Sequence, residues 1–359
     1  MSNRTRILLV AAVLLVVIVW AWLHFRTQPQ WQQFSAEEFW NSLKNAKQSY
    51  LLLGACLTFA SYLGRAFRWR AFLRPLKAAS LWKIFSSTLI GFSAVALASR
   101  AGEIVRPWLI ARKEELPLSS QLGAWTLERI FDSLMLVALL GVALWFVPAA
   151  AAQQGISAAL LASFRSAGAV FTALAVLLAG LMAQLRYFPR FTAAVVGFFA
   201  RPLPERYRTG LQQMLEHFSA TLAVIEDSRR FLGCIGWTAL VWGTLWGAYW
   251  SAALALGPPL SSLPASAMVL LMLASVTGSL FYVPGVGGGT QVAMVLTLTE
   301  LFGVPLTFAT SLALVIWVMT FLLVLLPGVP LAAREGLSWR SLRRLVGGQE
   351  KSPSPERGP

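Results

Sequence analysis

A charged segment interrupts an apolar stretch at residues 99–107, whose sequence is SRAGEIVRP. If a helix starts after Gly102, then Glu103 and Arg106 are three residues apart, share a face and can form an ion pair. A charge in or near hydrocarbon costs about 2.5–3.5 kcal/mol on insertion scales, so such residues mark candidate functional sites. We therefore regard Arg100, Gly102, Glu103 and Arg106 as candidate substrate-binding residues. A solvated cytoplasmic loop is the alternative interpretation.

A second charged group, Glu128, Arg129 and Asp132, opens another apolar run. The two carboxylates are one helical turn apart and face the same way, with the guanidinium beside them. The group can bind a cationic headgroup, relay protons, or pair with Arg100 and Arg106 across a helix bundle. The alternative is a structural salt bridge that only ties two helices together.

A third candidate is the glycine-rich segment 284–291, PGVGGGTQ. Backbone N–H groups at such a turn can receive phosphate oxygens, especially where a helix begins directly afterwards. The segment is not a P-loop, because it lacks the Gly-Lys-Ser/Thr ending and lies between apolar helices. Close helix packing is the alternative. The candidate residues here are Pro284, Gly285, Gly287, Gly288, Gly289 and Gln291.

Other kinds of site have little support in the sequence. The only histidines are His24 and His217, and the two cysteines, Cys56 and Cys234, are far apart in apolar segments. No metal cluster or Cys/His nucleophile can be drawn from them. The longest polar region, residues 186–230, is amphipathic and too short for a soluble catalytic domain. We predict no catalytic residue, metal or cofactor.

Composition shows which elements must position these residues. Of 359 residues, 57% are hydrophobic and 13% are charged, against about 25% charged in a typical soluble domain, and the mean hydropathy is +0.64. The chain is therefore predicted to be a polytopic membrane protein. The formal net charge of +15 is explained by basic cytoplasmic loops and anionic lipid headgroups, so nucleic-acid binding is not predicted.

Loop charges set the expected orientation. Segment 65–83 holds six basic residues and no acid, and segments 186–230 and 334–359 each carry a net charge of +3, so all three are predicted to be cytoplasmic, as are both termini. Segments 148–166 and 257–263 are predicted to lie outside. The expected full spans are 7–23, 49–64, 121–147, 167–185, 231–256 and 306–332. An interfacial helix within 30–48, capped by Ser35 and Glu38, is expected between the first two.

Two re-entrant hairpins complete the prediction. Residues 84–99 are expected to enter the membrane from the cytoplasm, to turn near 100–102 and to return through 103–111. A full span there would place segment 148–166 inside and the basic segment 186–230 outside, against the positive-inside rule. Residues 264–282 and 291–303 form either two full spans or a second hairpin, and the proline and glycines favour the hairpin. The predicted fold is an all-α membrane bundle over 1–346, with about six spans and two hairpins, then a disordered tail, 347–359.

At these motifs the chain resembles the family named for the membrane region of lysylphosphatidylglycerol synthase. Arg100, Gly102, Glu103 and Arg106 match its G-R-x-G-E-x-x-R pattern, Glu128, Arg129 and Asp132 match E-R-x-x-D, and Pro284, Gly285 and Gly288 match P-G-G-x-G-x-x-E. Three positions depart from the patterns, namely Ser99, Val286 and Gln291. Gln291 stands where the family pattern has Glu, and the loss of that acid weakens any role of this position in binding protons or cations. Core repeats 84–147 and 264–332 are expected in the inverted arrangement of transporters.

The resemblance implies a flippase-like module of the bacterial inner membrane whose partners are membrane lipids. In the bifunctional synthases a separate soluble domain carries the aminoacyl transfer, and this sequence shows none, so we expect a transporter and not an enzyme. Two alternatives stay open. One is an intramembrane enzyme, or an accessory subunit of envelope lipid synthesis, with Glu128 and Asp132 as acid and base. The other is a scaffold that binds an envelope-synthesis enzyme. The lipid, its direction, the coupling ion and the oligomeric state are not predicted.

Overall fold

The computed structural model describes residues 34–154, 227–279, 282–283 and 287–337, with single positions between 162 and 191. These residues are helical apart from short turns and a two-residue antiparallel ribbon, in which β1 (Tyr282–Val283) pairs with β2 (Gly287–Gly288). The helices are α2 (Ala36–Lys44), α3 (Gln48–Leu73), α4 (Leu81–Ala98), α5 (Val105–Glu114), α6 (Leu118–Gln154), α10 (Ser228–Leu256), α11 (Ala265–Gly278), α12 (Gly289–Leu296), α13 (Leu306–Trp317) and α14 (Leu325–Arg334).

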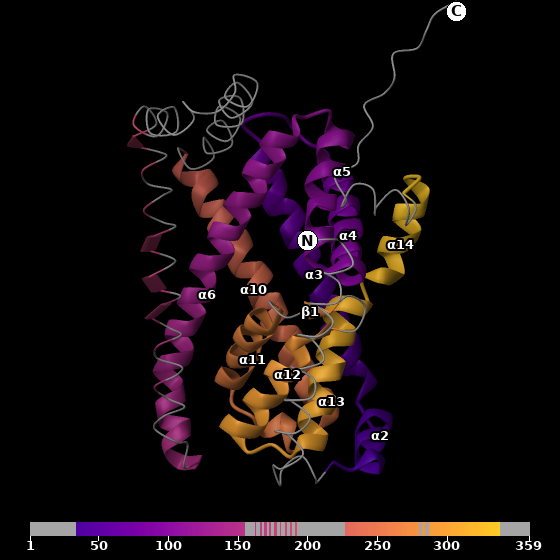
Figure 1. Ribbon diagram of the computed structural model, residues 1–359, viewed down its shortest axis with the longest axis vertical. Helices are drawn as coiled ribbons and strands as arrows, with labels where there is room; N and C mark the ends of the chain where they lie inside the picture. The colour runs from indigo at the N-terminus through magenta and orange to yellow at the C-terminus, as the bar shows by residue number, and fades with distance from the viewer. Residues whose placement is uncertain are drawn as a thin grey trace, which may run out of the picture.

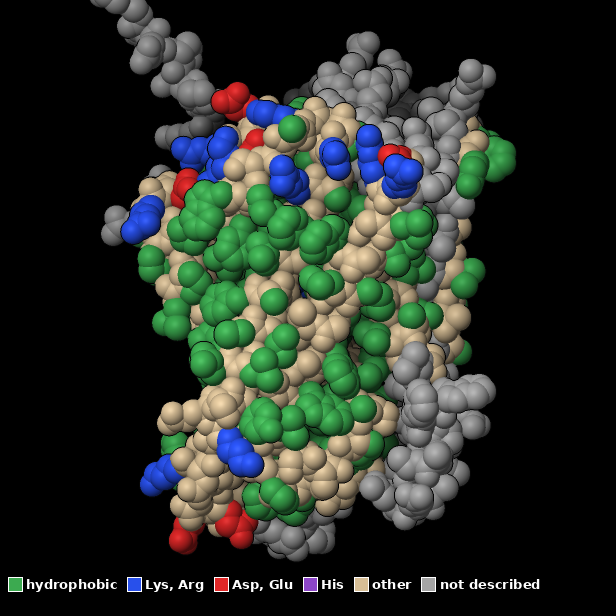
Figure 2. Space-filling view, turned by 180° about the vertical axis from the view of Figure 1, so that it is seen from behind, with side chains coloured by type: hydrophobic (Ala, Val, Ile, Leu, Met, Phe, Trp, Pro, Cys, Tyr) green, Lys and Arg blue, Asp and Glu red, His purple; other side chains and the backbone are tan. Residues whose placement is uncertain are grey.

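Four helical stretches in the described part are long and apolar enough to cross a membrane: 48–73, 81–98, 229–256 and 306–334. On the face seen in Figure 2, hydrophobic side chains form a broad belt, and most of the Lys and Arg side chains lie at its upper end. The prediction of a membrane protein with several apolar helices is confirmed. The expected span at 7–23 lies outside the described residues, and the one at 167–185 is described only at isolated positions.

Helix α3 packs along α10 at the centre of the bundle (Figure 1). Glycines allow the close approach: a Cβ on Gly64 would lie 3.0 Å from Val241, and Phe67 stacks on Trp237 with ring centroids 4.6 Å apart. The expected end of this helix at Gly64 is wrong. No proline or glycine lies between Gly64 and Pro75, so the helix continues to Leu73 and carries the first arginines of the predicted cytoplasmic segment into the bundle.

At the position of the first expected hairpin, α4 and α5 fold back on each other around a 3₁₀ turn, Ser99–Ile104, although α4 by itself is long and apolar enough to cross a membrane. Its open end is closed by Lys113, whose ammonium donates to Ser86 Oγ (3.0 Å) and whose carbonyl accepts from Lys83 Nζ (2.8 Å). Near its middle, a Cβ on Gly91 would lie 2.5 Å from the Cβ of Arg106. The ten residues of α5 rise only about 15 Å.

A second fold-back joins α11 to α12 through the β1–β2 ribbon. A Cβ on Gly278 would lie 2.3 Å from the carbonyl oxygen of Gly289, so the two helices cross at their backbones. The 14 residues of α11 rise about 21 Å, less than a hydrocarbon core of about 30 Å. The two fold-backs occupy opposite halves of the molecule (Figure 1).

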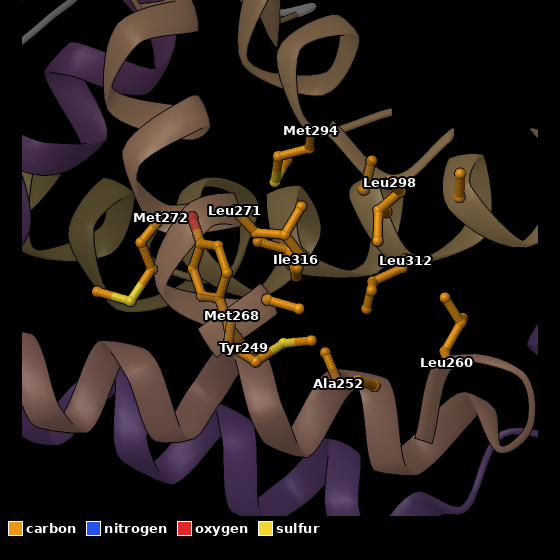
Figure 3. Close-up of a cluster of buried hydrophobic side chains, with 14 of the residues drawn as sticks. Tyr249, Ala252, Leu260, Met268, Leu271, Met272, Met294, Leu298, Leu312 and Ile316 are labelled. Carbon is orange, nitrogen blue, oxygen red and sulfur yellow. The ribbon is translucent and has the colours of Figure 1, made fainter. Parts of the chain in front are cut away.

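The largest hydrophobic core lies in the half of the molecule that contains the second fold-back. Tyr249 and Ala252 from α10 meet Met268 and Leu271 from α11, and residues of α12 and α13 close the cluster (Figure 3). The expected interfacial helix, α2, lies at the same end and has no buried residue. The Ser35 half of its predicted cap is confirmed, because Ser35 Oγ accepts from the Glu38 N–H at 3.2 Å. The half assigned to Glu38 is wrong, because the Ser35 N–H donates to Thr307 Oγ1 at 3.1 Å.

Candidate functional site

Arg68 is the centre of a buried ionic network. Its Nη1 donates to Asp132 Oδ1 at 2.8 Å and to Thr238 Oγ1 at 3.0 Å, while its Nη2 donates to Glu128 Oε1 at 2.8 Å. The side chain is 0% exposed. One guanidinium therefore ties α3 to both α6 and α10 in the interior of the bundle.

Arg106, on the first turn of α5, forms the second strong pair. Both of its terminal nitrogens donate to Glu128, one to each carboxylate oxygen. Its guanidinium also lies over the Trp69 ring, 4.2 Å from the centroid, with the Phe92 ring 5.5 Å away on α4. Trp69 is fixed in turn by its indole N–H, which donates to Gln121 Oε1 at 2.9 Å. Aromatic faces and a bidentate carboxylate hold this cation firmly.

Two further arginines lie at longer range. Nη1 of Arg65 is 3.7 Å from an oxygen of Glu128 and 3.7 Å from one of Asp132. Nη2 of Arg129 is 3.7 Å and 3.5 Å from the same two carboxylates. The Arg129 side chain is 45% exposed, whereas that of Arg65 is 11% exposed. The ion pairs of these two arginines are looser than those of the other two.

We call Arg65, Arg68, Arg106, Glu128, Arg129 and Asp132 the arginine cluster. Four cations and two anions leave an excess of two positive charges (4 − 2 = +2). Buried like charges repel one another and are costly unless paired, so a buried excess of this kind favours an anionic ligand. Glu103, which lies within electrostatic range of Arg129, reduces the excess to one when it is counted.

Two residues of the first predicted motif have different roles: Gly102 packs against α4, and Arg106 belongs to the arginine cluster. Gly102 lets the turn touch α4, since a Cβ there would lie 2.4 Å from the Ala94 backbone. Arg106 pairs with Glu128, and the expected pair with Glu103 is not found among the described residues, because Glu103 faces a cavity beside α6. The side chain of Arg100 lies outside what the structure describes.

The second motif lies about three turns into α6. Its residues come together as expected, because Arg129 lies within ion-pair distance of both Glu128 and Asp132. The third motif behaves differently. Gly289 packs its backbone on Gly278 of α11, and Thr290 Oγ1 donates to the Ser275 carbonyl at 3.5 Å. These contacts match the packing interpretation of the glycine segment.

Other residues of the third motif add little to the site. Gly287 and Gly288 form β2, and Gln291 is partly buried on α12. Pro284 and Gly285 lie outside the described residues. The main packing partners of α12, which begins at Gly289, are α11 and α13, and neither helix carries a residue of the arginine cluster.

Sequence reasoning missed Arg65 and Arg68, which were counted only as charges of a cytoplasmic segment. Their spacing contained the signal. They continue a helical face at three- and four-residue intervals that begins with Thr58, Ser61 and Tyr62, all buried in the structure. Trp242 was also missed; its indole N–H donates to Asp132 Oδ1 at 3.1 Å.

Metal chemistry finds no support in the described residues, where no three His, Cys, Asp or Glu side chains gather into a group that could hold an ion. No curated protein matches the sequence. The family model of the lysylphosphatidylglycerol synthase TM region matches residues 7–328, which cover all three charged or glycine-rich motifs. The chain therefore belongs to the lysylphosphatidylglycerol synthase transmembrane-region family, as its motifs indicate.

Proposed function

We propose that the protein moves a phospholipid across a bacterial cytoplasmic membrane and that the arginine cluster binds the phosphate of the lipid. The observation that carries the proposal is the excess of positive charge that three largely buried arginines and the half-exposed Arg129 create around two buried carboxylates. A phosphodiester supplies the missing negative charge and several acceptor oxygens, and guanidinium groups bind phosphate well.

The four arginines have different expected roles. Arg68 and Arg106 make short, multiple bonds to the carboxylates, so they hold the helices together. The guanidinium nitrogens of Arg65 and Arg129 lie 3.5–3.7 Å from the carboxylate oxygens. These two side chains can therefore turn towards a ligand with little loss of ion-pair energy. Arg129 is the more exposed of the two, so it is the best candidate for first contact with the phosphate.

The two fold-backs are proposed to be re-entrant hairpins, as in transporters whose broken helices meet near the membrane midplane. Their short helices, α5 and α11, support this topology. Both chain termini are proposed to lie in the cytoplasm on the basis of the loop charges. A change in how the α4–α5 hairpin packs on α6 would then alter access to the cluster. Gly91 is a sensitive position for such a change, since its Cα lies against Arg106.

The enzyme hypothesis assigned acid and base roles to Glu128 and Asp132. Both oxygens of Glu128 accept from guanidinium groups, and Oδ1 of Asp132 accepts from Arg68 and Trp242. Carboxylates bound in this way have little freedom to exchange protons with a substrate. The geometry therefore favours a role for these carboxylates in holding the arginines over a role as acid and base.

The test is lipid exchange in liposomes that contain the purified protein and a fluorescent phospholipid. The fraction of label reached by a membrane-impermeant reductant is followed over time for the wild type and for Arg129→Gln. We expect Arg129→Gln to slow exchange at least tenfold. Arg112→Gln is the matched control, because Arg112 is an exposed arginine on α5 outside the cluster. Equal rates for wild type and Arg129→Gln would refute the assignment.

The same assay, run with several headgroups, defines the substrate class. Phosphatidylglycerol, lysylphosphatidylglycerol and phosphatidylethanolamine share the phosphate and differ in net charge. Exchange of at least one of them above that of protein-free liposomes is expected, and exchange of none would contradict a translocator. Glu128→Ala is a weaker probe, because it leaves several buried arginines without their main partner and is expected to destabilise the fold as well.

A further inference from the structure

A cavity of about 330 Å³ opens beside the arginine cluster, between the tip of the first hairpin and α6. We call it the lateral pocket. Its size is near the lower limit of about 300–1,000 Å³ for small-molecule sites, so it accommodates part of an apolar chain but not a whole two-chain lipid. Its lining residues are Glu103, Ile104, Pro107, Leu122 and Trp125.

Two residues of the pocket wall lie on the same face of α6 as Arg129 of the cluster. Leu122, Trp125 and Arg129 are spaced three and four residues apart, so their side chains point to the same side of the helix. Seven residues of helix rise about 10 Å, which places an apolar wall at one end of this face and a guanidinium, 45% exposed, at the other. Glu103 stands at the same edge, within electrostatic range of Arg129.

The surroundings of the pocket are apolar. Ile104 in its wall is 37% exposed, and Leu118, one turn before Leu122 on α6, is 40% exposed. Both side chains are apolar and exposed, so in a membrane protein they offer a surface for contact with lipid. An occupant that arrives from this side therefore comes from the bilayer.

We propose that the lateral pocket takes one acyl chain of an anionic phospholipid, whose phosphate lies beside Arg129, so that the lipid reaches the cluster sideways between α5 and α6. The placement of the phosphate rests on the proposed function. The apolar wall and the adjacent cation match the two chemical parts of such a lipid, and the chain remains in an apolar environment while the headgroup enters the protein.

Photo-crosslinking tests the pocket without relying on transport. The probe is a phosphatidylglycerol with a diazirine on one acyl chain, irradiated in liposomes with the protein, and adducts are mapped by mass spectrometry. We expect adducts concentrated at 104–107 and 122–125, and at least fivefold fewer of them in Leu122→Trp, which fills the cavity. Leu326→Trp, at an exposed position of α14 outside the pocket, is the control and should leave the adducts unchanged.

A second variant and a competition make the result decisive. Ile104→Trp fills the pocket from the opposite wall and should have the same effect as Leu122→Trp, which guards against misfolding of one variant. Unlabelled phosphatidylglycerol should displace the probe more strongly than zwitterionic phosphatidylcholine. Adducts no more frequent in the pocket than at Leu232, an exposed α10 residue, would overturn the proposal, as would equal displacement by both lipids.

Exchange rates of the same variants separate this proposal from the proposed function. If the pocket is labelled in the wild type and loses its label in the Trp variants, but no phospholipid is exchanged, then the lipid site is supported and the translocator function is refuted. If Arg129→Gln abolishes exchange while Leu122→Trp exchanges lipid at the wild-type rate without pocket adducts, the translocator stands and lateral access through this pocket is wrong.

Discussion

Replacing Arg68 with methionine removes the cation at the centre of the buried network while keeping a long apolar side chain. The variant loses two charge-assisted hydrogen bonds, to Asp132 and Glu128, and a neutral one to Thr238. Each charged bond contributes about 1.5–3 kcal/mol, and the neutral bond contributes about 0.6 kcal/mol within a membrane. Relief of repulsion among the remaining arginines offsets part of this loss. We therefore expect the free energy of unfolding to fall by about 3–5 kcal/mol, the range for breaking a buried ion pair.

The assay is reversible unfolding of the purified protein in mixed micelles with increasing SDS, followed by circular dichroism. Arg70→Met is the matched control, since Arg70 is exposed on the same helix and its replacement should change stability by less than about 0.5 kcal/mol. In a double-mutant cycle, Arg68→Met and Asp132→Asn should show a coupling of about 1–3 kcal/mol. If Arg68→Met and Arg70→Met unfold alike, the network does not hold α3 to α6, and the division of roles among the arginines is wrong.

Two further substitutions test other contacts. Gly278→Ala places a Cβ 2.3 Å from the backbone oxygen of Gly289, so we expect it to lower the unfolding free energy by about 1–3 kcal/mol through overpacking. Gly243→Ala, whose added Cβ meets nothing within 4 Å, should instead raise the unfolding free energy by up to about 1 kcal/mol. If Gly278→Ala were the more stable of the two variants in SDS unfolding, the close crossing of α11 and α12 would be wrong. Arg230→Gln breaks the 3.1 Å pair with Asp227, whose two side chains are 40% and 43% exposed, so a change under about 1 kcal/mol is expected in the same assay. A loss as large as that of Arg68→Met would refute the distinction between surface and buried pairs.

Several features of the fold could be predicted because their signals are local. Hydropathy and the low share of charged residues identify apolar helices, since each helix in lipid must satisfy its own backbone hydrogen bonds. The proline and glycines of 284–289 and the charged turn near 100–102 mark places where helices reverse, and both fold-backs are present. The motif at Glu128, Arg129 and Asp132 was found by spacing alone, because its members lie within one and a half turns of helix.

Other features depended on the tertiary structure. The basic residues of segment 65–83 indicated a cytoplasmic loop, yet Arg65 and Arg68 lie inside because carboxylates on α6, some 60 positions away in the sequence, supply partners that make their burial tolerable. Arg106 had a nearby carboxylate at Glu103 and a distant one at Glu128, and only the folding of the α4–α5 hairpin against α6 decided between them.

The sequence by itself determined that the chain is a helical membrane protein, where its charged and glycine-rich motifs stand, and to which family it belongs. Those properties depend on residue type and spacing within single segments. Only the tertiary structure decided that four arginines converge on two carboxylates and that the glycine segment packs on its own hairpin. The physical reason is that the energy of a buried charge depends on which opposite charges surround it in space, and those come from helices far apart in the sequence.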